Sequence, residues 1–164
     1  MPTVYSPPVS TYVALATTTA SGGETSITFS SIPATYRDLV LVSYHQTSSD
    51  GPCLVRFNSD TGSNYTRVSM LGDGSNDFSE TSTTTGIRVS QTGVDIDNTI
   101  IMQIMDYSAT DKHTTTLNRW SRPELYVFAD AARWANTSAI NTVAIVPTGS
   151  FNAGSTFSLF GIAS

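Results

Sequence analysis

Short runs of alternating apolar and polar residues recur along this chain and are separated by turn-forming residues. The run Ser26–Ser30 alternates, as in a strand with one face in water. Asp38–Tyr44 is apolar on both faces and is predicted to lie centrally in a packed sheet. Leu54–Asn58 leads into a turn rich in Asp, Gly and Asn. These three runs predict the core of an antiparallel β domain.

The same reasoning predicts further strands at Thr11–Thr18, Tyr65–Leu71, Ile87–Ser90, Thr99–Asp106, Lys112–Arg119, Ala139–Val146 and Thr156–Ile162. Lys112–Arg119 is interpreted as an exposed or edge strand, where a lysine blunts strand pairing. Gly72–Thr85 is predicted to be the longest irregular region. Glu124–Trp134 fits either a helix or a strand by spacing.

The predicted fold is all-β: an antiparallel, jelly-roll-like β-sandwich of about ten short strands. Residues 11–164 are expected to form this single domain, since a chain of 164 residues is one domain by the usual prior. Residues 1–10 contain three prolines and are predicted to form an extended N-terminal arm.

Two segments also carry a family resemblance. The sequence SITFSSIPATYRDLVL, beginning at Ser26, is followed by RFNSDTGSNY, ending at Tyr65. This pair resembles a family of small virion proteins of tailed bacteriophages, including phages of cyanobacteria, whose members pair a (S/V)TFSSIP–TY–DL segment with an RFN–D–G–NY segment. Arg133–Ile140 and Ser155–Ile162 also match. The resemblance implies a jelly-roll-like sandwich on the virion, and it favours a strand at residues 124–134.

Composition narrows the classes of partner. Charged residues make up 13% of the chain, and the net charge is −5 with a pI near 4.7. A nucleic-acid partner would call for clustered Lys and Arg, so none is expected. No apolar run approaches the length of a membrane span, and no membrane partner is expected. The first residues lack the basic and apolar regions of a secretory signal, so we expect folding in the host cytoplasm.

The candidate catalytic groups are few. Cys53 is the only cysteine, which rules out an intramolecular disulfide and favours a buried thiol. His45 and His113 lie far apart in sequence, without a nucleophile motif or metal-ligand spacing around them. We therefore predict no enzyme activity, no catalytic or cofactor-binding residues and no cofactor.

Acidic loops and aromatic side chains suggest two further sites. Asn58, Asp60 and Asn64 around Gly62 faintly resemble a calcium loop, but the bidentate Glu of such loops is missing, and Asx turns explain these residues. We therefore predict no metal site. Four aromatic residues form either a stacking platform for a sugar or part of the core or a subunit contact, and the second interpretation is favoured; they are Trp120, Tyr126, Phe128 and Trp134. Arg56, Arg67, Arg119 and Arg133 are expected to pair with Asp38, Asp60 or Asp106, either across strands or between subunits.

The resemblance implies two alternative functions. The first is a capsid decoration (cement) protein that binds the outer face of the head, bridges and stabilises capsomers, and forms a homotrimer; its partner is the major capsid protein. Residues 2–10 and Gly72–Thr85 are its expected contact segments. The alternative is a tail-fibre or receptor-binding component that recognises cell-surface glycan. Both place the protein on the virion, and the favoured decoration function places it on the head exterior.

Overall fold

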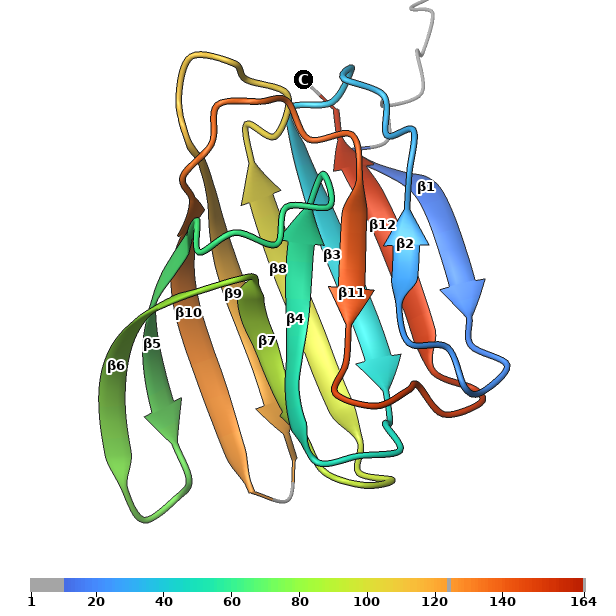
Figure 1. Ribbon diagram of the computed structural model, residues 1–164, viewed down its shortest axis with the longest axis vertical. Helices are drawn as coiled ribbons and strands as arrows, with labels where there is room; N and C mark the ends of the chain where they lie inside the picture. Colours follow the sequence, from blue (N-terminus) through green and yellow to red (C-terminus); the bar gives the residue numbers. More distant parts are fainter. Residues whose placement is uncertain (1–10, 124, 164) are drawn as a thin grey trace, which may run out of the picture.

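The computed structural model describes residues 11–123 and 125–163, which form two antiparallel sheets packed face to face (Figure 1). Along the described chain the strands are β1 (Tyr12–Thr19), β2 (Ile27–Phe29), β3 (Asp38–His45), β4 (Gly51–Phe57), β5 (Tyr65–Gly72), β6 (Asp77–Thr84), β7 (Ile87–Thr92), β8 (Asn98–Met105), β9 (Thr114–Arg122), β10 (Tyr126–Trp134), β11 (Val143–Val146) and β12 (Thr156–Ile162).

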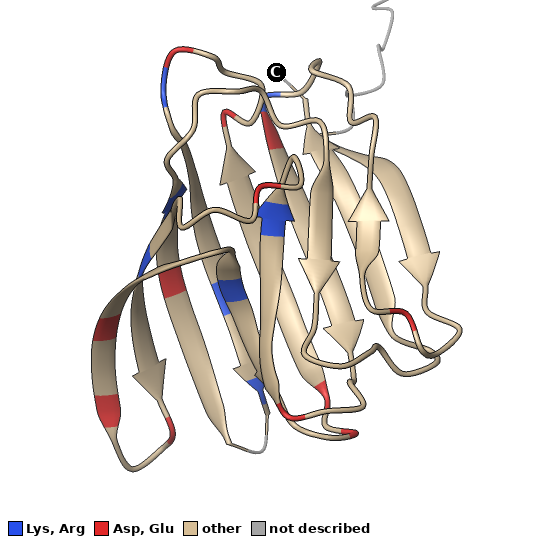
Figure 2. Ribbon diagram, in the orientation of Figure 1, with Lys and Arg blue, Asp and Glu red and all other residues tan. Residues whose placement is uncertain are grey.

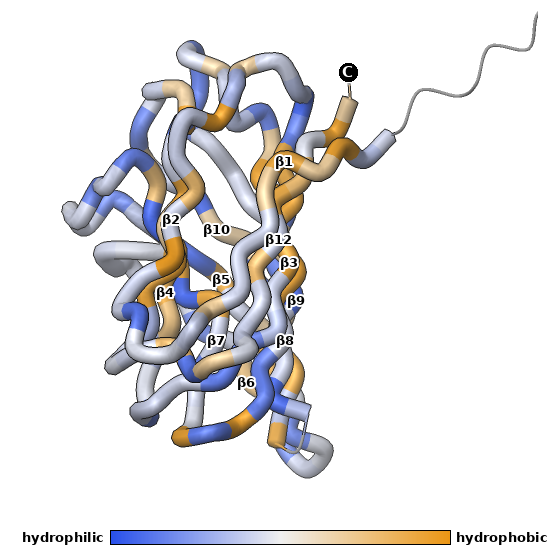
Figure 3. The backbone as a smooth tube through the Cα atoms, turned by 90° about the vertical axis from the view of Figure 1, so that its right-hand side faces the viewer, coloured by the Kyte–Doolittle hydropathy of each residue, from blue (hydrophilic) through white to orange (hydrophobic). Residues whose placement is uncertain are grey.

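The two sheets differ in size. One has eight strands in the order β1-β12-β3-β8-β9-β10-β5-β6, and the other has four in the order β2-β11-β4-β7. Figure 3 shows the two layers edge-on, with β2 and β4 in one layer and β3, β8, β9 and β12 in the other. The predicted all-β antiparallel sandwich is confirmed, with twelve strands in the described residues where about ten were predicted.

The core lies between the layers and follows the alternation of each strand. In β8 every second side chain, from Ile100 through Met102 to Ile104, is fully buried. β3 is buried along Asp38–Leu41 and pairs with β12 on one side and β8 on the other. The sequence prediction that this strand is central is therefore confirmed.

The four-stranded sheet covers only part of the larger one. β7 is its edge strand and packs against β8, β9 and β5. Figure 1 shows β5 and β6 continuing past β7 at the side of the molecule. The inner face of the larger sheet is therefore backed by a full sheet near β3 and β12, whereas near β5 and β10 it meets the edge of β7 and Phe57 of β4, which packs against Tyr65 and Trp134.

Three sequence predictions about local structure need correction. β6 forms within Gly72–Thr85, which was expected to be irregular. Its Ser- and Thr-rich sequence has no apolar pattern to indicate a strand, and β6 forms at the edge of the sheet by pairing with β5 alone. β9 is not an edge strand, since it lies between β8 and β10. The strand predicted at Ala139 begins only at Val143.

Other predictions hold or lie outside the structure. The ambiguous segment before Trp134 is strand β10, as the resemblance favoured. β12 has the predicted bounds. The predicted arm of residues 1–10 lies outside the described residues.

Candidate functional site: the open face of the eight-stranded sheet

The middle of β5, β9 and β10 has polar side chains on its inner face. Arg67, Ser69, Thr116, Asn118 and Asp130 all point between the sheets and are each at most 4% exposed. Neighbouring strands bring them together, because Asn118 pairs with Asp130 and Asp130 with Ser69. A charged and polar cluster thus occupies a position where a sandwich ordinarily buries apolar residues.

This inner cluster is partly satisfied by internal bonds. Arg67 pairs with Glu80 and with Asp130, at 3.5 Å in the second case, and donates to Ser69. The Trp120 indole donates to Asp130. Burial raises the pKa of the Asp130 carboxyl, against the opposing influence of these hydrogen bonds and of Arg67. The Asn118 amide has no hydrogen-bond partner among the described residues, so the cluster is stabilised less completely than an apolar core.

The outer face of the same strands has the opposite character. Met70 is 68% exposed and Leu117 is 53% exposed. Small apolar residues, Ala129 and Ala131, lie between them on β10. The large exposed apolar side chains on this face of β5, β8, β9 and β10 are Val68, Met70, Ile101, Leu117 and Val127. Polarity is therefore inverted in this part of the sheet, with polar residues inside and apolar residues outside.

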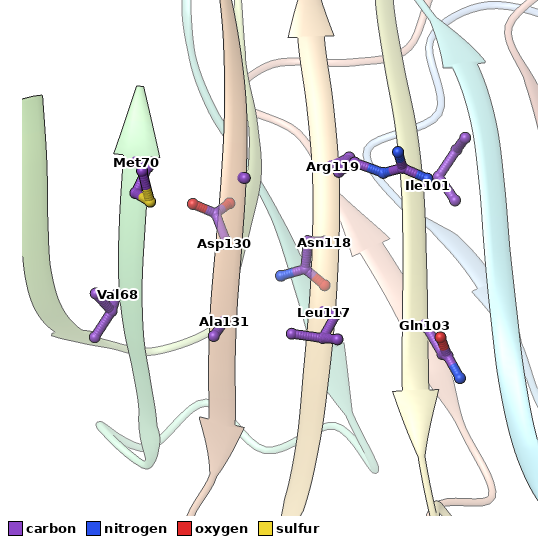
Figure 4. Close-up of a pocket in the computed structure, with 10 residues that line it drawn as sticks. Val68, Met70, Ile101, Gln103, Leu117, Asn118, Arg119, Asp130 and Ala131 are labelled. Carbon is purple, nitrogen blue, oxygen red and sulfur yellow. The ribbon is translucent and has the colours of Figure 1, made fainter. Parts of the chain in front are cut away.

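The apolar outer face is hollowed. A shallow groove of about 570 Å³ runs over β5, β10, β9 and β8, from Val68 and Met70 to Ile101 (Figure 4). A hollow of about 270 Å³ shares Leu117 and Ala131 with it, and another of about 230 Å³ shares Ile101 with it. The three depressions are continuous along the strands. Together they form one broad concave surface, which we call the outer groove.

Two arginines mark the outer groove. Arg119 lies in its centre, and Figure 4 shows the side chain extending from β9 across β8 toward Ile101. Arg133 lines the hollow at one end. Neither forms an ion pair or hydrogen bond with a described residue. The outward positions of β5, β8, β9 and β10 include no acidic residue, and Figure 2 shows the acidic residues mostly in loops and on β6.

The candidate catalytic residues lie elsewhere and are buried or isolated. His45 is enclosed between the sheets, with its Nδ1 3.1 Å from Ser43 Oγ and its Nε2 3.2 Å from Ser90 Oγ, and burial lowers its pKa to about 4. Burial raises the pKa of the Cys53 thiol to about 12. His113 is exposed in the loop before β9. The structure places His45 and Cys53 beside the same Ser90 side chain, both buried, and leaves His113 apart from them.

The Asp60 loop uses its own oxygen atoms internally. Asp60 Oδ1 accepts from the Gly62 N–H at 2.8 Å, and Asp60 Oδ2 accepts from Asn64 and from the Trp134 indole at 2.9 and 2.7 Å. These bonds, the Trp134 bond foremost, lower the pKa of Asp60. Asn58 instead binds the 139–142 segment. Within residues 11–123 and 125–163, no three His, Cys, Asp or Glu side chains are grouped so as to hold a metal ion.

The aromatic residues belong to the core, as favoured from the sequence. Trp120, Phe128 and Trp134 are buried, and the Trp120 and Phe128 rings stack with centroids 3.6 Å apart. Tyr126 is half-buried and packs against them. Within one chain, the expected pairs between these arginines and Asp38, Asp60 or Asp106 do not form. Arg67 pairs with Glu80 and Asp130, whereas Asp38 pairs with Arg37 and Asp106 with Lys112.

A small polar hollow of about 170 Å³ lies near the C-terminal end of β3. Gln46, Asp95 and Asp97 line it. The Tyr44 hydroxyl and the Gln46 amide both donate to Asp97 Oδ1, at 2.6 and 2.7 Å, and Tyr44 is 46% exposed. An exposed tyrosine beside carboxylate and amide groups can contact a polyol.

No protein-family model and no curated protein matches this chain. In the described residues, no helix is long and apolar enough to cross a membrane. The sequence analysis did not identify the outer groove, although one signal for it exists. Leu117 is an odd number of residues from Trp120 on the same strand, so a buried Trp120 requires Leu117 to face outward.

Proposed function

We propose that this protein is a non-enzymatic phage virion structural protein: a capsid decoration (cement) protein that binds the outer face of the head and bridges and stabilises capsomers. The observation that carries the proposal is the inverted polarity around the outer groove. If the stability of the isolated chain alone determined which residues are buried, Leu117 and Met70 would lie inside. Arg67 and Asp130 would then lie outside, which is the reverse of what is observed. The arrangement is favourable when a partner covers the outer face.

Covering this face would contribute substantial free energy. Burying a large aliphatic side chain stabilises an interface by about 1.5–3 kcal/mol. Five such side chains surround the outer groove. A protein that binds only the assembled shell stabilises that shell by mass action. The exposed apolar face supports binding to a partner, and the proposal takes the major capsid protein as that partner and the head exterior as the location.

The virion assignment is supported by the sequence resemblance alone. The paired matching segments, Ser26–Leu41 and Arg56–Tyr65, include β2, the first half of β3 and the turn after β4. As part of the same proposal the protein is a homotrimer, the arrangement expected for small β-sandwich decoration proteins.

The alternative proposal is a tail-fibre or receptor-binding component that recognises cell-surface glycan. The polar hollow beside Tyr44, Gln46 and Asp97 favours it, because aromatic and amide or carboxylate groups together recognise sugars. A Tyr44→Ala variant separates the two functions: it should lose binding to host cells under the alternative and keep full binding to heads under the decoration proposal.

The decisive experiment measures the copy number of the protein in purified particles of the encoding phage by quantitative mass spectrometry against the major capsid protein. Hundreds of copies in fixed proportion to the capsid protein support decoration. A few to a few tens of copies favour the tail and the glycan alternative. Absence from particles overturns both virion proposals.

A further inference from the structure

We propose that the outer groove binds an extended segment of the capsid protein that carries two carboxylates four positions apart, with an apolar side chain midway between them. This inference rests on the proposed function for the identity of the partner. The chemistry of the segment is inferred from the groove itself.

The length of the groove favours an extended occupant. Its linked depressions follow β9 from Thr115 through Leu117 and Arg119 to Ser121. Six residue steps along a strand span about 20 Å. Every second residue of each strand faces the groove. An extended segment lying on it would likewise place every second side chain against the groove floor.

The charges define the two outer positions of the segment. Arg119 pairs with Ala129 across the β9–β10 ladder, and Arg133 lies four residues further along β10. The two arginine Cα positions are therefore separated by about 13 Å along the strand direction. In an extended segment this is the spacing of residues i and i+4. Both arginines lack an acidic partner among the described residues, and a carboxylate at each position would supply it.

Leu117 and Ala131 define the middle position. They pair with each other across the ladder, midway between the levels of Arg119 and Arg133, and both are exposed. An apolar side chain at position i+2 would cover them. Arginine and large apolar residues together are typical of the centre of an interface rather than of a free surface.

Charge argues against a second copy as the occupant. Because the outward positions of β5, β8, β9 and β10 carry Arg119 and Arg133 and no carboxylate, two such faces packed about a twofold axis would bring like charges together. The capsid segment avoids this repulsion.

The test uses purified heads that lack the protein and measures binding of the full chain by cosedimentation. We expect the double variant Arg119→Glu/Arg133→Glu, and separately Leu117→Asp, to bind at least about tenfold more weakly than the natural chain. Arg119→Lys, which keeps the charge, should bind within about threefold of it.

Two controls match these changes elsewhere on the surface. Lys112→Glu alters the charge as each arginine substitution does, and Val94→Asp introduces an acid at another exposed apolar residue. Both should bind like the natural chain, and urea unfolding midpoints should be unchanged for every exposed substitution.

The outcomes separate the two proposals. If the natural chain does not bind heads, the decoration function fails. If it binds and the groove variants bind equally well, the function stands and the groove inference is wrong. If the free protein self-associates and Leu117→Asp abolishes that association, the occupant is a second copy, which also overturns the inference.

Discussion

The two halves of the eight-stranded sheet stabilise the fold by different means. Beneath the four-stranded sheet, β3 and β12 present Leu41, Phe157 and Leu159, which are essentially fully buried. Beyond β7, β5 and β10 present Arg67 and Asp130 to the same interlayer space. The first half has a full sheet to pack against, whereas the second meets the edge of β7 and Phe57 of β4.

This difference separates stability from assembly within one sheet. An apolar interior contributes hydrophobic free energy, whereas a buried ion cluster contributes little net stability because desolvation opposes the attraction between its charges. In the second half, Arg67 and Asp130 lie among buried aromatic residues on the inner face, and the large aliphatic residues line the outer groove. We therefore expect the apolar half to determine folding and the polar half to determine binding.

The largest expected effect is in the apolar half. Phe157→Ala should lower the free energy of unfolding by about 4 kcal/mol, because it opens a cavity between the sheets where Phe157 contacts Phe151 and His45. The matched substitution Phe78→Ala, at a 50% exposed residue of β6, should cost only about 1 kcal/mol. Urea unfolding measures both. Equal losses would contradict the division between the halves.

The next effect is in the polar half. Arg67→Met should destabilise the protein by about 3 kcal/mol, because it leaves the buried Asp130 carboxylate without its cation. Adding Asp130→Asn removes that charge while keeping an acceptor for the Trp120 indole, and should restore at least half of the loss. A double-mutant cycle by urea unfolding measures the coupling. Strictly additive losses would show that the two charges act independently.

The two halves should also respond to pH in opposite directions. His45 has a folded pKa of about 4 against an ordinary 6.5, so its contribution to stability is complete above pH 6.5 and is lost as pH falls toward 4, by about 3 kcal/mol. Asp130 has a raised pKa, so its contribution is complete below pH 3.8 and is lost as pH rises through the folded value. The slope between pH 6.5 and 4 should flatten in His45→Gln and steepen in Asp130→Asn. Unchanged slopes would contradict these assignments.

The apolar half was predictable from the sequence and the polar half was not. Asp38–Tyr44 is apolar on both faces, so its central position follows from pattern alone. In β5 the alternation is broken, because Tyr65 falls in one alternating set and Val68 and Met70 in the other, so nothing local indicates which set is buried. The β6 edge strand has no apolar pattern to detect. The outer groove depends on the register of β5, β8, β9 and β10 together, which only the fold determines.

The smallest expected effect is at the turn that connects β4 of the small sheet to β5 of the large one. Calcium should leave the thermal unfolding midpoint unchanged, because the Asp60 carboxylate is already held by the Gly62 N–H, the Asn64 amide and the Trp134 indole. A cation would have to displace these bonds to gain ligands, and the EF-hand pattern's final glutamate is missing.

Asp60→Ala should cost about 1–2 kcal/mol at neutral pH by leaving the largely buried Trp134 N–H without an acceptor. Because the folded pKa of Asp60 is lowered, its contribution is present above pH 3.8 and is lost as pH falls through the folded value, so the variant and the natural chain should converge in stability in acid. A calcium-dependent rise in the midpoint that Asp60→Ala abolishes would instead make this turn a metal site.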